Sequence, residues 1–304
     1  MNSERYNLEK KQSGFNFESE HFDIDGTEVD SIDVIPENQK DEVPVLVAPG
    51  WGATIESFKP SIKVLADKGR RVISLSHPRQ GGIVPDLHNI EIEEWYQKRN
   101  KEYPDWPTEE LRKANTILEL LDHKNLDKVD VIAHSEGAIN LCIAAMLHPE
   151  KFEGRTIILY TPAGLIGKDT FFRLKRGGKE NRERPQSISG IPVTITETEQ
   201  LELMKNVLSD YVKANPLRAF KETLAMAKTQ IQDMLRYLHE KGIKIIIIGA
   251  VDDAIFPMER LQTNVKADFI DGFLSVSGGH KQLQVHPELY MSAAEKMLAQ
   301  PEEK

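Results

Sequence analysis

The sequence predicts an α/β fold in which a mainly parallel sheet has helices on both faces and carries an inserted helical cap. Short, nearly continuous apolar runs, typical of strands buried on both faces, alternate with segments of helical spacing. One of these runs passes directly into a helix through a turn that holds Ser135. The alternation then stops between Gly167 and Lys241, where only helical patterns occur.

The first part of the chain predicts a hairpin at the edge of the sheet, then a strand, a helix and a strand. Alternating apolar residues from Phe15 to Ile35, with a turn at Asp25-Gly26, indicate the hairpin. The near-continuous apolar run that follows indicates the first buried strand. The elements expected here are a strand over Val43 to Ala48, a helix over Glu56 to Lys68 and a strand over Val72 to Leu75.

The middle of the chain combines an irregular stretch with the serine-bearing strand. Ile83 to Pro107 is rich in aromatic and charged residues without a period, and we expect it to pass over the strand ends. Helical spacing returns from Glu109 to His123. The serine-bearing strand and helix occupy Val129 to Ala145, and a further strand covers Thr156 to Tyr160.

The segment from residue 166 to 242 is predicted to be the cap, and residues 1–165 with 243–304 the core domain. In the cap, the charged run Lys175 to Arg184 predicts a solvated, mobile loop. Two helices follow, the second with Asn215 as N-cap and Pro216 as its first residue. The elements expected after the cap are a strand over Ile243 to Ile248, a helix over Met258 to Val265, a strand over Phe273 to Val276 and a helix over Pro287 to Leu298.

Ser135 has the setting of a nucleophile elbow, the sharp turn that raises a serine hydroxyl above the edge of the sheet. The usual pattern G-x-S-x-G is present here with Ala133 at the first small position and Gly137 at the second. A serine hydroxyl needs a histidine to accept its proton and a carboxylate to orient that histidine. His280 follows the last predicted strand, and Asp252-Asp253 follows the strand before it. These residues share the carboxyl edge of the sheet, in the chain order Ser, Asp, His.

Such a site also needs backbone N–H donors for the oxyanion that forms during acyl transfer. Glu136 can supply one because it follows the nucleophile, and Trp51, just past the first buried strand, can supply the other.

With these motifs in place, the sequence resembles the capped form of the α/β-hydrolase superfamily from about Val43 to the C-terminal helix. The resemblance implies Ser135 as nucleophile and His280 as base. It also favours Asp253 as the acid, through the phrase D-x-x-x-P that ends at Pro257, whereas counting from Gly249 favours Asp252. The matching stretches are PGWG, SHPRQGG, AHSEGA, GAVDDAIFP and SGGH, with Pro49 in place of the leading histidine of the family's oxyanion loop.

Other histidines compete with His280 for the role of base. His134 precedes the nucleophile, so its side chain should pack or form a hydrogen bond inside the elbow. His286 is expected to cap a helix or lie at the surface, and it is the best substitute for His280. His77 is expected to be a structural turn residue near the site, with substrate contact as the alternative.

The composition narrows the function classes. A net charge of -9 argues against a general nucleic-acid or anionic-membrane surface, although a local basic patch remains compatible with it. The polar N-terminus and the lack of a membrane-spanning apolar run favour a cytoplasmic protein. No His, Cys or carboxylate cluster has metal-site spacing, so neither a metal nor a cofactor is expected. The single cysteine, Cys142, is expected in the core.

The sequence therefore predicts a serine hydrolase that cleaves a carboxylic ester or related small acyl substrate through an acyl-enzyme. A C–C bond hydrolase, lactonase, thioesterase or peptidase needs the same groups, so these activities stay open. A ligand-binding protein that retains the fold without catalysis is the alternative of another class. The cap could also form a homodimer interface.

Overall fold

The computed structural model describes residues 17, 19–24, 26–78, 106–183, 195–265 and 267–298. Of the predicted irregular stretch from Ile83 to Pro107, residues 83–105 lie outside the described part of the chain. Phe15 and Asp25 of the predicted hairpin also lie outside it. Most of the SHPRQGG stretch is also outside it.

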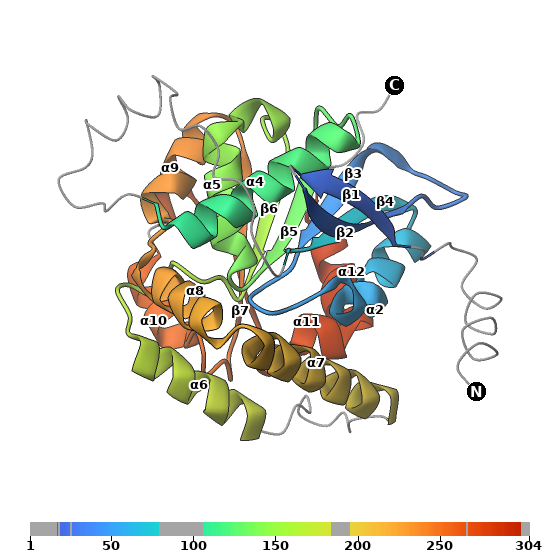
Figure 1. The fold of residues 1–304 in the computed structure, drawn as a ribbon. Coiled ribbons are helices and arrows are strands. Elements are labelled where there is room, and N and C mark those ends of the chain that lie inside the picture. Colours follow the sequence, from blue (N-terminus) through green and yellow to red (C-terminus); the bar gives the residue numbers. More distant parts are fainter. Residues whose placement is uncertain are drawn as a thin grey trace, which may run out of the picture.

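An eight-stranded sheet forms the centre of the molecule, in the order β1-β2-β4-β3-β5-β6-β7-β8 (Figure 1). β1 and β2 pair antiparallel with each other and β2 pairs antiparallel with β4, whereas the remaining neighbours pair parallel. The predicted edge hairpin and mainly parallel sheet are thus confirmed. The strands are β1 (Glu20–Ile24), β2 (Thr27–Val34), β3 (Asp41–Ala48), β4 (Arg70–Ser76), β5 (Asp130–His134), β6 (Thr156–Tyr160), β7 (Lys244–Ala250) and β8 (Gly272–Val276).

Helices cover both faces of the sheet, because the central strands are apolar on both sides and each side must be shielded from water. One face packs against α4 (Thr108–His123), α5 (Gly137–Leu147) and α9 (Gln232–Glu240). The opposite face packs against α2 (Ile55–Asp67), α11 (Gln282–Val285) and α12 (Pro287–Glu295). The remaining short helices are η1 (Pro149–Lys151), α10 (Met258–Asn264) and η2 (Ala267–Phe269).

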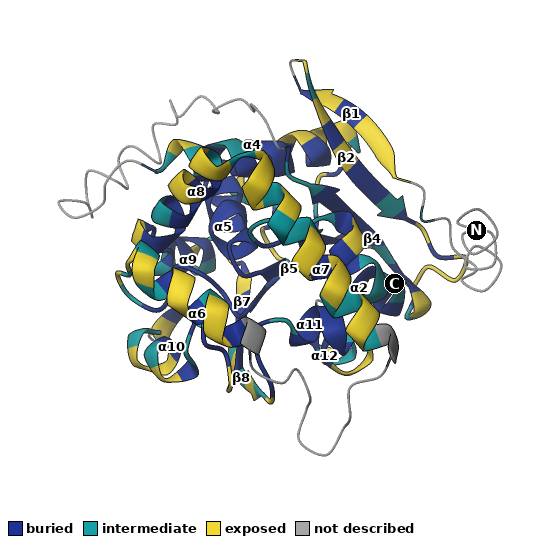
Figure 2. Cartoon of the chain, turned by 60° about the horizontal axis from the view of Figure 1, so that its bottom comes forward, coloured by how far each residue is buried: buried dark blue, intermediate teal, exposed yellow. Residues whose placement is uncertain are grey.

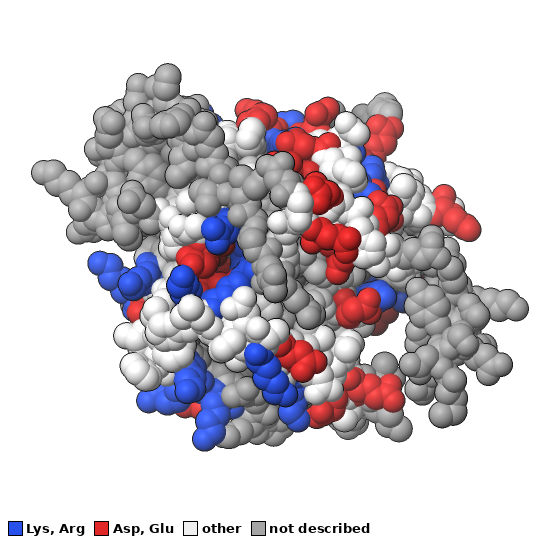
Figure 3. All heavy atoms as spheres, in the orientation of Figure 1, with Lys and Arg blue, Asp and Glu red and all other residues white. Residues whose placement is uncertain are grey.

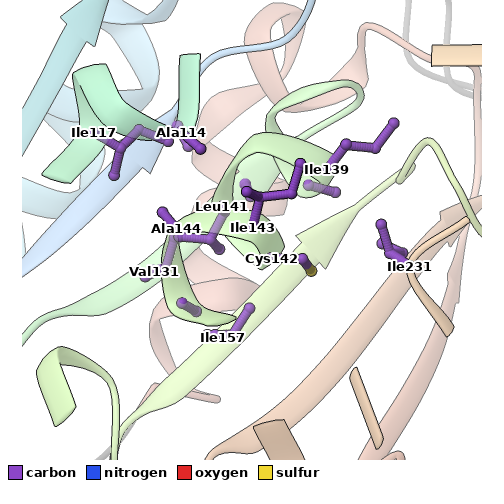
Figure 4. Close-up of a cluster of buried hydrophobic side chains, with 14 of the residues drawn as sticks. Ala114, Ile117, Val131, Ile139, Leu141, Cys142, Ile143, Ala144, Ile157 and Ile231 are labelled. Carbon is purple, nitrogen blue, oxygen red and sulfur yellow. The ribbon is translucent and has the colours of Figure 1, made fainter. Parts of the chain in front are cut away.

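α5 is buried along its whole length, from Gly137 to Leu147. Figure 4 shows its aliphatic side chains together with residues of α4, β5 and β6. Cys142 lies in this cluster as a small core residue, and burial raises the pKa of its thiol. A helix enclosed on all sides in this way holds the turn before it in a fixed position.

Three helices lie beyond the carboxyl ends of the strands: α6 (Phe171–Glu183), α7 (Ile195–Ala214) and α8 (Pro216–Lys228) (Figure 1). Figure 2 shows that their outward faces are largely exposed. In the described part of the chain, every helix is too short or too polar to cross a membrane.

Two predictions for this segment were wrong. The charged run from Lys175 is helical as far as Glu183, where a loop was expected, because its charges point outward and pair along the helix, as Arg176 does with Glu180. The second predicted helix is two helices. Asn215 caps α8 as predicted, but the chain leaves the helix at Thr229, and the Ile231 N–H donates to the Gly164 carbonyl before α9 begins.

Candidate active site

Ser135 occupies a strained turn between β5 and α5. Its φ of 57° lies in the left-handed region, which costs a residue with a side chain about 1–2 kcal/mol. The turn is held from two sides, because the Ser135 N–H donates to Tyr160 on β6 and the Ser135 carbonyl accepts from Ala163. A Cβ at Gly137 would lie 2.6 Å from the Pro49 carbonyl oxygen, so only glycine lets α5 start this close to the loop after β3.

His280 follows β8 and is joined to Asp253, which follows β7. The distance from His280 Nδ1 to Asp253 Oδ2 is 2.8 Å, and both side chains are buried. The other Asp253 oxygen accepts from the backbone N–H groups of Ile255 (2.7 Å) and Phe256 (3.0 Å). Burial raises the pKa of Asp253, but the charge and hydrogen bond of His280 and these two N–H groups outweigh burial and lower it. Asp253 is therefore a carboxylate at neutral pH, and it accepts a hydrogen bond from the Nδ1–H of His280.

His134 connects the loop of His280 to the turn of Ser135. Its Nε2 lies 2.9 Å from the His280 carbonyl oxygen, and the two rings are 4.8 Å apart between centroids. Because a carbonyl oxygen can only accept, Nε2 of His134 carries the proton. Burial and the nearby His280 lower the pKa of His134 to about 3, so its ring is neutral. His134 therefore has the packed, hydrogen-bonded role that its sequence position predicted.

The loop after β3 lies directly against the nucleophile. A Cβ at Gly50 would come within 2.7 Å of the Ser135 Cβ. Within the described residues, the backbone N–H groups of Trp51 and Glu136 donate to no protein acceptor. These are the two N–H groups that the sequence suggested as oxyanion donors, and in this part of the chain the protein itself makes no use of them.

The remaining candidates from the sequence lie apart from this arrangement. Asp252 is exposed, whereas its neighbour Asp253 is buried against His280. His286 caps α12 and is buried rather than at the surface, with its Nδ1 2.6 Å from Glu197 of α7. His77 lies at the end of β4, and neither of its ring nitrogens has a hydrogen-bond partner in the structure.

A buried charged cluster, which the sequence analysis did not identify, lies beneath the elbow. The side chain of Glu136 accepts from Lys113 Nζ of α4 at 2.6 Å, and Lys113 also lies 3.4 Å from Glu222 of α8. All three side chains are at most 4 % exposed. The residue that follows the nucleophile is thus connected through one lysine to the cap.

Glu222 is the centre of this cluster. One of its oxygens accepts from the indole N–H of Trp51 at 2.9 Å and from the Tyr211 hydroxyl of α7. The other accepts from Arg218 Nε at 2.9 Å. Burial raises the pKa of Glu222, but Lys113, Tyr211 and Arg218 outweigh it and lower the pKa, so this carboxylate stays ionised.

The other ionisable groups of the cluster shift in the opposite direction. Burial raises the pKa of Glu136 to about 7 even beside Lys113. Burial and the charge of Glu136 raise the pKa of Glu110 on α4 well above its usual value. Burial would lower the pKa of Lys113, but the charges of Glu136, Glu222 and Glu110 outweigh it and raise the pKa. The cluster therefore stays close to neutral by keeping protons on buried carboxyl groups.

A cavity of about 270 Å³ lies between this cluster and the loop after β3. Its wall includes the cations Lys113 and Arg218, the imidazole of His77 and the phenol of Tyr211. Gly50, which contacts Ser135, is also part of the wall. Burial and the charges of Lys113 and Arg218 lower the pKa of His77 well below its usual value, so His77 offers a neutral donor and acceptor.

Each cap helix contacts a different loop of the site. α6 lies against the loops of Asp253 and His280: a Cβ at Gly177 would lie 2.3 Å from the Ala254 carbonyl oxygen, and the His280 N–H donates to Asn181 Oδ1 at 3.4 Å. Arg173 Nη2 also donates to the Ile255 carbonyl at 2.6 Å. α7 lies over the loop after β3, where a Cβ at Gly52 would lie 2.6 Å from Leu208 Cδ1. α8 reaches the same loop through Glu222. The cap is thus part of what positions the site.

Metal-ligating groups gather at one place among the described residues, outside this site. His21, Glu28 and Asp30 meet on the exposed hairpin because β1 and β2 pair His21 with Asp30. The register of the hairpin, not spacing along the chain, brings them together. All three are exposed, and His21 Nδ1 already lies 2.8 Å from Asp30 Oδ1.

The sequence did contain a signal for the charged cluster. Glu110 occupies the apolar face of its helix with Ala114 and Ile117, and Glu222 lies among Ala219 and Met226 on α8. A carboxylate at an apolar position of a helix needs a buried partner. The buried lysine beside Glu222, Lys113, comes from α4, more than a hundred residues earlier in the chain.

The comparison with known proteins matches residues 43–287 to the family model described as alpha/beta hydrolase fold. Solved structures with a similar fold include a bacterial membrane phospholipase A (13 % identity, 97 % of this chain and 89 % of the other, TM-score 0.62). Another is a carboxylesterase of Nitrososphaera gargenis (17 % identity, 91 % of this chain and 97 % of the other, TM-score 0.60). A third is the enol-lactonase of Burkholderia xenovorans (14 % identity, 91 % of this chain and 98 % of the other, TM-score 0.61). Identities this low support the fold alone.

Proposed function

Because the chain belongs to the alpha/beta hydrolase fold family, we propose that it is a serine hydrolase that cleaves a carboxylic ester or related acyl compound through an acyl-enzyme. The observation that carries the proposal is the hydrogen bond between His280 Nδ1 and Asp253 Oδ2. This bond fixes the tautomer of the neutral ring, with the proton on Nδ1 and Nε2 as the acceptor, in a loop that His134 joins to the turn of Ser135. A neutral imidazole in that state is the base that a serine nucleophile requires.

The steps follow from these positions. The Ser135 hydroxyl attacks the acyl carbon while His280 Nε2 takes its proton, and the Trp51 and Glu136 N–H groups stabilise the oxyanion. His280 then gives the proton to the leaving group, which departs as an alcohol and leaves the acyl group on Ser135. A water molecule, deprotonated by His280, releases the acid and restores the hydroxyl. Asp253 stabilises the imidazolium at each transfer.

The cavity beside Gly50 favours a substrate that carries a polar group. Its volume fits a small polar part of the acyl group or of the leaving group. Lys113, Arg218, His77 and Tyr211 can donate to oxygens of that part, and the carboxylates of Glu28 and Asp30, which also line the cavity, can accept from its hydroxyl or amino groups. The cap, for which we propose residues 166–242, sets this selectivity because α7 and α8 supply Tyr211 and Arg218. A lactone would open through the same steps.

Labelling with a fluorophosphonate probe tests the proposal, together with turnover of a panel of p-nitrophenyl esters and lactones. Wild-type protein should become labelled, and Ser135→Ala should lose both labelling and turnover while its circular dichroism is unchanged. Ser277→Ala is the matched control, since this exposed serine lies on the loop of His280. Folded wild-type protein that stays unlabelled, or labelling that survives in Ser135→Ala, would contradict the proposal.

A further inference from the structure

The outer surface of α6 and α8 carries a cluster of exposed apolar side chains. Phe172, Leu217 and Phe220 expose 80 %, 65 % and 43 % of their surface. The ring of Phe171 joins the two helices, with its centroid 5.6 Å from that of Phe172 and 4.8 Å from that of Phe220. Single exposed apolar residues are ordinary, but a contiguous group of this kind marks an interaction surface.

The charged residues around this cluster are mainly basic. The exposed basic residues of this surface are Lys168, Lys175, Arg176, Lys179, Lys221 and Lys228, whereas Arg173 and Arg218 point inward and pair with the nearly buried Asp169 and Glu222. Glu180 of α6 is also exposed, and it lies 3.6 Å from Arg176. Figure 3 shows Lys and Arg atoms over α6 and α8, whereas Asp and Glu atoms gather on the side of the β1–β2 hairpin. This local charge is opposite in sign to the net charge of -9.

Helical spacing gives α6 two different faces, one exposed and one packed against the loop of Asp253. Phe172, Lys175 and Arg176, followed by Lys179, recur every three or four residues and are exposed. Arg173 and Gly177 lie on the opposite face, against the acid loop. The contacts described between α6 and the loops of Asp253 and His280 come from Arg173, Gly177 and Asn181 on its other face, so a partner can bind the exposed face without displacing them.

We propose that the surface of α6 and α8 docks the protein onto an anionic lipid bilayer. Phe172, Leu217 and Phe220 enter the interface, and the surrounding Lys and Arg side chains lie against the lipid phosphates. Aromatic and aliphatic side chains ringed by basic ones are the pattern of helices that bind in the plane of an interface, and each basic residue adds to the attraction of an anionic surface. Acyl chains adapt to isolated phenyl rings, so no preformed groove is required. The docking does not depend on the proposed hydrolase activity.

Sedimentation with lipid vesicles tests the proposal on the full chain at low and high salt. We expect binding to vesicles of equal parts phosphatidylcholine and phosphatidylglycerol, weak binding to phosphatidylcholine alone, and loss of binding in high salt. The double variants Lys175→Glu/Arg176→Glu and Phe172→Ser/Phe220→Ser should each weaken binding about tenfold or more. The matched control is Leu289→Ser/Lys296→Glu, which changes an exposed leucine and lysine of the α12 region, packed against α2 and α11. Circular dichroism checks the fold of each variant.

The results separate a lipid surface from other anionic partners. Wild-type protein that stays in the supernatant with anionic vesicles overturns the proposal, as does binding that the control variant weakens equally. Binding to polyglutamate beads as strong as to anionic vesicles, with the Phe172→Ser/Phe220→Ser variant unaffected on both, would assign the surface to an acidic protein and overturn the lipid assignment.

Discussion

The indole N–H of Trp51 donates a hydrogen bond to Glu222, with 2.9 Å between Nε1 and Oε2. This bond joins the loop after β3 to α8 of the cap. The backbone N–H of the same residue is one of the two proposed oxyanion donors, so Glu222 of the cap holds the loop for which we propose stabilisation of the transition state. Donors of this kind act only when their position is fixed before the reaction.

Trp51→Phe removes this hydrogen bond, replaces the indole by a smaller aromatic ring and keeps the backbone N–H. We expect kcat for a p-nitrophenyl ester to fall about tenfold with KM little changed, because the backbone N–H of residue 51 is still present but its loop is held less firmly. Tyr211→Phe is the comparison, since it removes another donor to Glu222 that is not on the loop. Because Tyr211 also lines the cavity, we expect its loss to act on KM and to leave kcat nearly unchanged. Both variants should lose about 1 kcal/mol of unfolding free energy in urea. Equal losses of kcat in the two would show that the bond of Trp51 has no special role.

Two adjacent aspartates differ in their contacts, and a pair of variants compares them. Asp253→Asn removes the charge that orients His280, and kcat should fall about 10³–10⁴-fold. Asp252→Asn changes an exposed side chain, and kcat should stay within about threefold of wild type. Stopped assays of ester turnover measure both. A larger loss in Asp252→Asn than in Asp253→Asn would reverse the assignment of the acid.

Replacing each of the two adjacent glycines of α6 by alanine should have opposite effects on the stability of the protein. A Cβ at Gly177 would lie 2.3 Å from the Ala254 carbonyl oxygen, whereas a Cβ at Gly178 would meet nothing within 4 Å. Gly178→Ala should stabilise the protein by about 0.5–1 kcal/mol, because alanine favours the helix. Gly177→Ala should destabilise it by about 1–3 kcal/mol and lower kcat, because it pushes the acid loop. Thermal unfolding and ester turnover measure the pair, and equal stabilities would show that α6 does not pack on that loop.

The sequence predicted the core of this fold well because its strands are short apolar runs bounded by turn residues. β6 and β8 were predicted to within one residue, and the order of strands and helices around Ser135 was correct. The proposed nucleophile, acid and base lie in loops at the ends of β5, β7 and β8, and parallel pairing brings such ends to one edge. Periodicity is enough to place residues in this way.

The cap was predicted less well because its helices depend on tertiary contacts. The break after α8 is invisible in the pattern, since Ile231 continues the apolar spacing and only its hydrogen bond to Gly164 shows why the helix stops. Outward charges on α6 resemble a solvated loop in the sequence. The pairing of Lys113 with Glu222 could not be predicted, because a buried charge indicates that a partner exists but not which one.

Glu110 predicts an unusual dependence of stability on pH. Both of its carboxyl oxygens are buried without a hydrogen-bond partner in the structure, and burial with the charge of Glu136 raises its pKa well above 4.5. Below pH 4.5 the carboxyl is protonated in the folded and unfolded chains alike. Above it the unfolded chain loses the proton that the folded protein keeps, so stability falls by up to about 1.4 kcal/mol per pH unit until the folded pKa is reached.

Glu110→Gln removes this titration and keeps the shape of the side chain. The variant should therefore be more stable than wild type, by a difference in unfolding free energy that grows as the pH rises above 4.5 towards the raised pKa of Glu110. Urea unfolding at several pH values measures that difference. Glu109→Gln is the control. Glu109 has a half-buried side chain on the same helix, so this substitution should change the unfolding free energy by less than about 0.5 kcal/mol at every pH measured. A Glu110→Gln variant that loses stability relative to wild type as pH rises would show that Glu110 is ionised in the folded protein and that Lys113 is its partner.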